Sequence, residues 1–151
     1  MARWLKVFTF IIFLFFLVVL LFYVRDYGGR YLFICVRRDD VVMMRLQVAD
    51  GENFTLTFVH SMYGGQVYVT YKITRNGFMP LEIASNDGAS ISYYTDDYTY
   101  NGTMFVSKLK GVSLNKIIID DGWSIIINGQ KYKLTGGNVY ELSLVSDFYE
   151  C

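Results

Sequence analysis

The sequence predicts an all-β domain, an antiparallel sandwich or barrel of about ten short strands, preceded by one N-terminal transmembrane helix. Three observations lead to this prediction. Residues 7–24 form an apolar run without a single charge. From residue 30 onward, short apolar runs alternate with turn residues such as Gly, Asn and Asp. After residue 27 no helical periodicity extends beyond one or two turns, which favours strands.

The apolar run is long enough to be a membrane anchor. Its 18 residues would span roughly 27 Å as a helix, close to the ~30 Å hydrocarbon core of a bilayer. Residues 1–6, with Arg3 and Lys6, form a short basic head, and residues 25–29 form a linker. A cleaved signal peptide is less favoured, because the apolar region is long and no small-x-small cleavage site follows it. We therefore expect an uncleaved signal-anchor that places residues 7–24 in the lipid bilayer.

The expected location of the β-domain, residues 30–151, is outside the cytoplasm of a single-pass cell-membrane protein. Positive charges flank the apolar run on both sides, so they do not decide the orientation. The domain holds two Asn-x-Thr sequons, which makes Asn53 and Asn101 candidate glycosylation sites. A short basic head before the first apolar run also resembles an export signal. Both features favour the outside orientation.

The clearest pair of strands lies in the stretch from Asn53 to Arg75. Apolar residues alternate with polar ones on both sides of Gly64-Gly65, a pattern that indicates two half-buried strands joined by a turn. Asn-Gly pairs mark two more hairpins, at residues 76–77 and 128–129. Other strands are expected at residues 30–36, 41–48, 79–84, 89–94, 104–109, 115–120, 123–128, 130–134 and 139–145.

Composition excludes several classes of partner and site. The formal net charge of the chain is zero, and no segment concentrates basic residues, so we expect no nucleic acid partner. One histidine and two widely spaced cysteines do not form a metal-ligand motif, so neither a metal nor a cofactor is expected. Cys35 and Cys151 would form a disulfide only if the first strand and the C-terminus lay side by side. Otherwise both are free thiols.

His60 and Ser61 are the first candidate site residues, because His60 is the only histidine of the chain. Neighbouring side chains of a strand point to opposite faces, so this Ser is not paired with this His as a nucleophile is paired with its base. One interpretation is structural, with His60 ending a strand and hydrogen-bonding the backbone. The other is contact with a ligand or partner, together with the turn at Gly64 and Gly65. Catalysis is not expected.

A tyrosine-rich segment, residues 93–103, is predicted to be an exposed loop or edge. Its tyrosines could stack on a sugar or line a protein interface, or they could be ordinary packing residues. Tyr98 and Tyr100 are the candidate contact residues of this segment.

The segment FTLTFVHSMYGGQVYVTYKI, followed by Pro80-Leu81-Glu82-Ile83, resembles the family known as domain of unknown function 1850. The hallmark of that family is a strand ending in His-Ser, followed by a second strand led by Val with an alternating aromatic. His60, Ser61, Val67 and Tyr71 hold those positions here. Members commonly begin with an export signal or anchor and are encoded near TRAP transporters of the TAXI type.

The resemblance implies that the protein acts by binding, as an accessory of a TRAP/TAXI-type solute transporter whose subunits are its candidate partners. The family tends to have a Gly-Ala-Gly-x-Pro-like turn after the third strand, and the nearest segment here, Asn86-Asp87-Gly88-Ala89-Ser90, lacks the second glycine and the proline. An alternative that the aromatic content and the sequons suggest is a cell-surface or envelope structural protein that binds glycan.

Overall fold

The structure is a computed structural model that describes residues 12–22, 31–137 and 139–151. The contacts divide the chain into two units, Met1–Tyr31 and Leu32–Cys151. In the first unit, residues 12–22 form a helix whose apolar side chains are exposed. Within the described residues, no helix has both the length and the apolar character needed to cross a bilayer. The basic head, the linker and both ends of the apolar run 7–24 lie outside the described residues, so the anchor stays a prediction.

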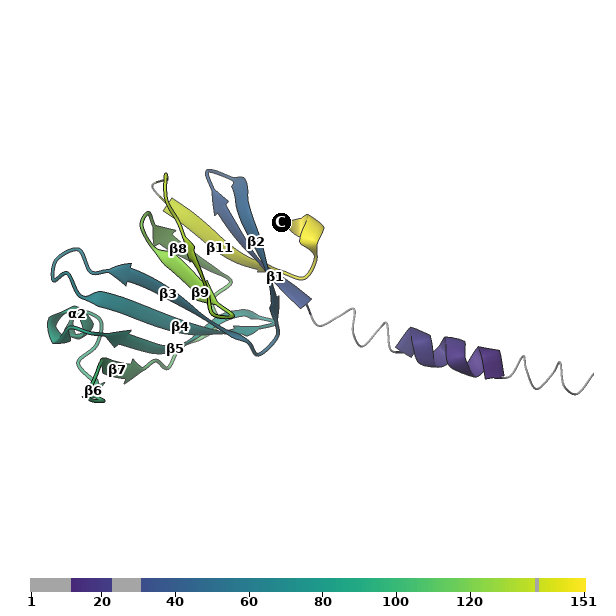
Figure 1. Ribbon diagram of the computed structural model, residues 1–151, viewed down its shortest axis with the longest axis horizontal. Helices are drawn as coiled ribbons and strands as arrows, with labels where there is room; N and C mark the ends of the chain where they lie inside the picture. The colour runs from purple at the N-terminus through teal and green to yellow at the C-terminus, as the bar shows by residue number, and fades with distance from the viewer. Residues whose placement is uncertain (1–11, 23–30, 138) are drawn as a thin grey trace, which may run out of the picture. The chain divides into compact units, whose positions relative to one another are not determined.

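The second unit contains two antiparallel β-sheets, which confirms the all-β prediction (Figure 1). The smaller sheet has the order β2 (Val41–Ala49), β1 (Tyr31–Arg38), β11 (Val139–Val145) and β8 (Lys116–Asp120). The larger sheet has the order β10 (Gln130–Lys133), β9 (Ser124–Ile127), β3 (Asn53–Val59), β4 (Gln66–Thr74), β5 (Gly77–Ser85), β7 (Phe105–Lys108) and β6 (Thr99–Tyr100).

One core joins the two sheets, so the domain is a sandwich. In β8, for example, Ile117 and Ile119 are buried and the residues between and beside them are exposed, as the period of two requires. Phe54 of β3 stacks on Tyr71 of β4 and meets Phe78 of β5 edge-on, with ring centroids 5.3 Å apart in both pairs. Burying such side chains supplies the main driving force for folding. The buried members of this core are Leu32, Ile34, Val36, Leu46, Val48, Phe54, Leu56, Ile73, Phe78, Ile117, Ile119, Ile125, Ile127, Leu134, Tyr140 and Leu142.

The larger sheet carries a second, smaller hydrophobic cluster. It is made by Val67, Val69 and Ile83 of β4 and β5. These residues sit on one face because Val69 pairs with Ile83 across β4 and β5. Figure 1 shows that the end of this sheet opposite the C-terminus carries the β3–β4 turn and a short helix, α2 (Gly88–Ser92). We call residues 58–68 and 84–106 the distal end.

Helix α2 corrects one expectation, because residues 89–94 were predicted to be a strand. Asp87 is the N-cap of this helix, and its side chain accepts hydrogen bonds from the backbone N–H and the hydroxyl of Ser90, both at 2.7 Å. Asp is among the strongest N-cap residues. Ser90 and Ile91 are fully buried, so packing holds the single turn in place. The predicted loop at 93–103 is largely exposed, and β6 lies within it.

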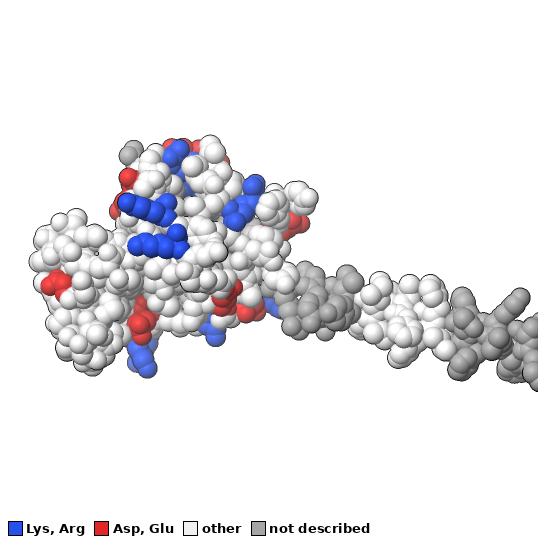
Figure 2. Space-filling view, in the orientation of Figure 1, with Lys and Arg blue, Asp and Glu red and all other residues white. Residues whose placement is uncertain are grey.

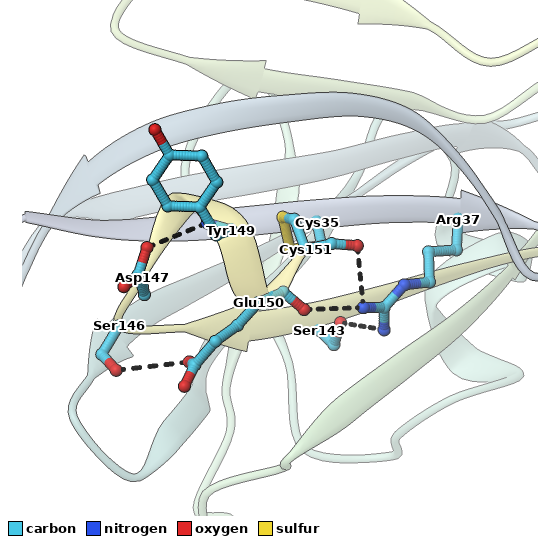
Figure 3. Close-up of a disulfide and its surroundings, with 8 residues drawn as sticks. All are labelled: Cys35, Arg37, Ser143, Ser146, Asp147, Tyr149, Glu150 and Cys151. Carbon is cyan, nitrogen blue, oxygen red and sulfur yellow. Dashed lines mark hydrogen bonds between the residues drawn. A yellow bond between two sulfur atoms is a disulfide. The ribbon is translucent and has the colours of Figure 1, made fainter.

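A disulfide joins Cys35 of β1 to Cys151, across 116 residues of sequence, with the two Cα atoms 5.6 Å apart (Figure 3). The C-terminal 3-10 helix η1 (Phe148–Glu150) brings Cys151 back over β1. The guanidinium of Arg37 donates to the carbonyl oxygens of Glu150 and Cys151, each at 3.1 Å. Of the two alternatives left open by the sequence, the structure selects the disulfide, because β1 and the C-terminus do lie side by side.

Candidate functional site

The hairpin of β3 and β4 confirms the strand–turn–strand prediction for residues 53–75. The two strands pair from Asn53 with Lys72 to Val59 with Gln66. The turn between them is closed by backbone hydrogen bonds of 2.8 Å, from His60 N–H to the Gly65 carbonyl and from Gly64 N–H to the His60 carbonyl. His60 therefore ends β3 as a fixed point of the backbone.

The two glycines of the turn are required for different reasons. Gly64 has a φ of +72°, which side chains other than Gly rarely adopt, and its surroundings are open. Gly65 has ordinary backbone geometry but lies against α2. A Cβ at Gly65 would come within 2.7 Å of Asp87 Cβ and would also collide with Ser90. Gly65 thus lets the helix approach the turn.

The ring of His60 is buried, with 5% of the residue exposed. Its Nδ1 accepts long hydrogen bonds from the backbone N–H groups of Met62 and Tyr63, at 3.3 and 3.4 Å. A nitrogen that accepts in this way carries no proton, so the ring proton belongs to Nε2. Among the described residues, Nε2 has no hydrogen-bond partner. The structural interpretation of His60 therefore accounts for one ring nitrogen and leaves the other available.

Three tyrosines surround the imidazole. Tyr63 stacks on it with a centroid distance of 5.0 Å, and Tyr93 meets it edge-on at 5.0 Å. Tyr94 meets it edge-on at 5.7 Å. Burial, and secondarily the neighbouring Tyr93, raises the pKa of the Tyr94 phenol, so this hydroxyl stays protonated at neutral pH. Because Tyr93 and Tyr94 follow α2 directly, the cap at Asp87 positions them beside the turn.

A cavity of about 350 Å³ opens beside His60. The β3–β4 turn, the residues after α2 and the β8–β9 connection supply its walls. Behind Tyr94, the rings of Phe58 and Trp123 stack with centroids 3.8 Å apart, which makes that wall continuous. The lining residues are Phe58, Val59, His60, Ser61, Met62, Tyr93, Tyr94, Asp120, Asp121 and Trp123.

The charge around this cavity is only negative. Asp120 and Asp121 line it, and no Lys or Arg does. The distal end contains no Lys or Arg at all, and its only acidic residues are Asp87, Asp96 and Asp97. On the face drawn in Figure 2, this end is almost free of charged atoms, whereas the rest of the domain displays both signs. A ligand with strong negative charge would find no ion-pair partner here.

Ser61 lies on the rim of the cavity and is exposed. Within the described residues, no hydrogen bond joins its hydroxyl to His60. The acceptor role of Nδ1 is also opposite to that of a catalytic histidine, whose Nδ1–H donates to an orienting carboxylate. A serine nucleophile activated by His60 is therefore not assembled in this geometry.

The other two tyrosines predicted to make contacts lie apart from the cavity. Tyr98 and Tyr100 both pack on Phe105 of β7, with centroid distances of 5.7 and 4.8 Å. The hydroxyl of Tyr100 donates to the carbonyl of Gly102 at 2.8 Å. Neither tyrosine lines the cavity beside His60. Their contacts brace the loop around β6.

Both sequon asparagines are exposed. Asn53 is the first residue of β3. The side-chain oxygen of Asn101 accepts from the backbone N–H groups of Thr103 and Met104, at 3.1 and 2.9 Å, and so closes its own turn. Their modification stays a prediction.

Sequence reasoning missed most of the cavity. Trp123, Asp120 and Asp121 come from a connection more than 50 residues after His60, and no motif joins them to it. Tyr93 and Tyr94 share one polar stretch with Tyr98 and Tyr100, so the sequence does not separate the two pairs. The Asp-Gly pair before Trp123 indicates a turn, but it does not indicate which turn meets it in space.

Comparisons of the chain with protein-family models, with curated proteins and with solved structures give no significant match. The resemblance to the 1850 family therefore stays a prediction, and the site is interpreted from its own geometry.

Proposed function

We propose that this chain is a membrane-anchored binding protein whose β-domain works outside the cytoplasm, and that the cavity beside His60 is where it binds. The observation that carries the proposal is the buried imidazole, whose Nδ1 is occupied by two backbone N–H groups while Nε2 is left without a partner. Among the described residues, only the Tyr140 hydroxyl is a fully buried side-chain polar atom without a partner, so Nε2 of His60 is open to solvent. An N–H that is open in this way can donate to a ligand in the cavity.

Binding fits this geometry better than catalysis. A general base needs an acceptor nitrogen within reach of the proton that it removes. Here the acceptor nitrogen is occupied by the turn, and the open nitrogen carries the proton. Such a ring can donate a hydrogen bond to a ligand, and the aromatic walls can supply contact area.

The disulfide supports the proposed compartment. Disulfides persist mainly in oxidising environments, such as the cell surface, and are rare in the cytosol. The Cys35–Cys151 bond therefore favours a domain on the outer side of the membrane, with residues 7–24 as its anchor. The opposite orientation would expose this bond to reducing conditions.

For the partner, the resemblance to the 1850 family suggests a TRAP/TAXI-type transporter, with this domain as an accessory subunit. The distal end is suited to such contact, because Met62 and Tyr93 are 70% and 63% exposed there. Interfaces are enriched in Met and Tyr relative to other surfaces. The second candidate, a glycan-binding surface protein, would use the same aromatic walls.

Two variants test this proposal in cells. Val112 is 81% exposed and lies outside the distal end, so Val112→Cys adds one accessible thiol. A membrane-impermeant maleimide should label this variant in intact cells, and the parent protein, whose cysteines are bonded, should stay unlabelled. A photo-crosslinking residue at Met62 should then capture a transporter subunit, whereas the same residue at Val112 should not.

Labelling only after lysis would contradict the outside orientation. Capture of transporter subunits from Val112 and Met62 alike would show that the distal end is not the contact. Capture of glycan-bearing surface material by Met62, without any transporter subunit, would favour the second candidate.

A further inference from the structure

We propose that the cavity beside His60 binds a small organic ammonium ion that carries an oxygen acceptor close to its charge, as an amino alcohol does. This proposal rests on the proposed binding function and adds the chemical class of the ligand. Three independent features of the cavity lead to it: the aromatic walls, the uncompensated carboxylates and the free imidazole nitrogen.

The aromatic walls suit a cation. The face of an aromatic ring is electrically negative and attracts an ammonium group placed over it. The rings of Tyr93 and Tyr94 stand edge to face, with centroids 5.2 Å apart, so their planes are nearly perpendicular. Trp123, the strongest type of cation–π partner, lines the same cavity. Alkylated ammonium groups gain most from such walls, because they are poorly hydrated.

The carboxylates set the sign of the ligand charge. Among the described residues, neither Asp120 nor Asp121 forms a salt bridge, and the cavity has no basic side chain. The side-chain oxygen of Asp121 accepts from Gly137 N–H at 3.4 Å, which orients the group without neutralising it. A carboxylate or phosphate ligand would meet repulsion from both aspartates. A cation would be attracted to them.

His60 supplies the third feature, which is independent of charge. Its Nε2–H is a donor on a residue that is only 5% exposed, and His60 lines the cavity. A bare ammonium group offers donors or methyl groups only, so it cannot satisfy this N–H. A hydroxyl or carbonyl oxygen near the ammonium can accept from it. This requirement selects amino alcohols and related molecules within the class of organic cations.

The size of the cavity agrees with such a ligand. Its volume of about 350 Å³ lies at the lower end of the range of roughly 300–1,000 Å³ that is usual for small-molecule sites. A large oligosaccharide would extend out of it, whereas a small amino alcohol would fit within it.

Choline and its uncharged carbon isostere, 3,3-dimethyl-1-butanol, separate charge from shape. The full chain is studied in a polyoxyethylene detergent, which contains neither choline nor sugar. Trp4 and Trp123 are the two tryptophans, so Trp4→Phe makes Trp123 the sole tryptophan reporter in the cavity. Choline should shift the Trp123 fluorescence with saturation, and the isostere should bind about tenfold more weakly or not at all, as loss of a cation–π contact predicts. Equal binding of both would overturn the proposal.

Matched variants locate the effect. Asp120→Asn with Asp121→Asn, and separately Tyr94→Leu, should each weaken choline binding by about tenfold. Asp96→Asn with Asp97→Asn, and Tyr100→Leu, change the same residue types at the distal end but outside the cavity, and should leave affinity within about twofold. Equal losses from both sets, with all variants folded by circular dichroism, would place the site elsewhere and overturn the proposal.

Phosphocholine distinguishes a free amino alcohol from a lipid headgroup. The phosphate would face the two aspartates, so phosphocholine should bind more weakly than choline. If it binds more tightly, the cation class holds and the source is a lipid. Saturable binding of methyl glucoside without any response to choline would overturn the proposal in favour of a sugar. Because the labelling and cross-linking experiments use no ligand, their success alongside failure here would reject the ligand class alone.

Discussion

The two ends of this β-domain are held together in different ways. At the end near the C-terminus, a covalent bond between Cys35 and Cys151 closes the structure, and the guanidinium of Arg37 binds the last carbonyl groups. At the distal end, α2 is five residues long and is held without a covalent bond, by one cap, by the burial of Ser90 and Ile91 and by close contact with the turn at Gly65. The covalent cross-link is thus at one end and the candidate binding surface at the other.

The difference between the two ends indicates why the hydrogen-bond donor Nε2–H of His60 can be left without a partner at the distal end. Local opening is easiest where few buried contacts hold a segment, and binding sites are commonly drawn from such segments. Val67, Val69 and Ile83 form a small cluster, whereas sixteen buried residues join the two sheets. The unpartnered nitrogen of His60 therefore lies in the part of the domain that contributes least to the core.

Removal of the disulfide should cause the largest loss of stability. Cys35→Ala with Cys151→Ala opens a loop closed over 116 residues, which should lower the free energy of unfolding by about 3–5 kcal/mol. Urea unfolding followed by circular dichroism measures this loss. Reductant should destabilise the parent protein to a similar extent and leave the double variant unchanged.

Under native conditions, the same double variant should retain the environment of Trp123, because the cavity lies away from the disulfide. A tryptophan fluorescence spectrum that differs between the folded double variant and the folded parent protein would mean that the disulfide end and the distal end are coupled. The two ends would then not be independent, as the comparison above assumes.

The two turn glycines should give a smaller effect that sharpens the contrast. Gly65→Ala forces a Cβ against Asp87 and Ser90, and overpacking of this kind costs about 1–3 kcal/mol. Gly64→Ala meets open space but keeps a φ of +72°, which costs roughly 1–2 kcal/mol. Thermal unfolding compares the two stabilities.

Only Gly65→Ala should also disturb the cavity, because it displaces the helix that positions Tyr93 and Tyr94. The near-ultraviolet circular dichroism signals of tyrosine and tryptophan measure this change in the packing of the aromatic side chains. If Gly64→Ala perturbs those aromatic signals as strongly as Gly65→Ala does, the role assigned to Gly65, which is to allow α2 to approach the turn, is wrong.

The smallest effect concerns the cap of α2. Hydrogen bonds from Ser90, first from its hydroxyl and then from its backbone N–H, lower the pKa of Asp87 below its ordinary value of 3.8. A lowered pKa in the folded state means that the ionised cap stabilises the domain above the unfolded pKa. That contribution is lost as the pH falls through the lower, folded pKa.

The melting-temperature difference between the parent protein and Asp87→Ala should therefore be constant from neutral pH down to about pH 5, and should shrink in stronger acid. Asp87→Asn keeps a good N-cap side chain, so it should lose less stability than Asp87→Ala at neutral pH. A difference that grows on acidification would contradict the assigned role of the carboxylate.

Local patterns in the sequence were sufficient for the all-β class, the hairpin at residues 53–75 and most strand positions. Alternation with a period of two and Asn-Gly turns are properties of neighbouring residues, so they can be detected without the fold. Residues 89–94 show the limit of this reasoning. Their apolar content suggested a strand, but the Asp87 cap and the close approach of Gly65 made a helical turn.

The tertiary structure alone decided the disulfide and the cavity. Cys35 and Cys151, like His60 and Trp123, are far apart in sequence. The pairing of β1 with β11 brings the two cysteines together, and the pairing of β3 with β9 brings His60 and Trp123 to one cavity. Which nitrogen of His60 is free also follows from the folded turn, because its two N–H groups occupy Nδ1. By itself, the sequence determined which residues could form strands, because side-chain alternation is local. Which of them meet is set by the packing of the whole domain, because the hydrophobic effect that drives this packing has no direction.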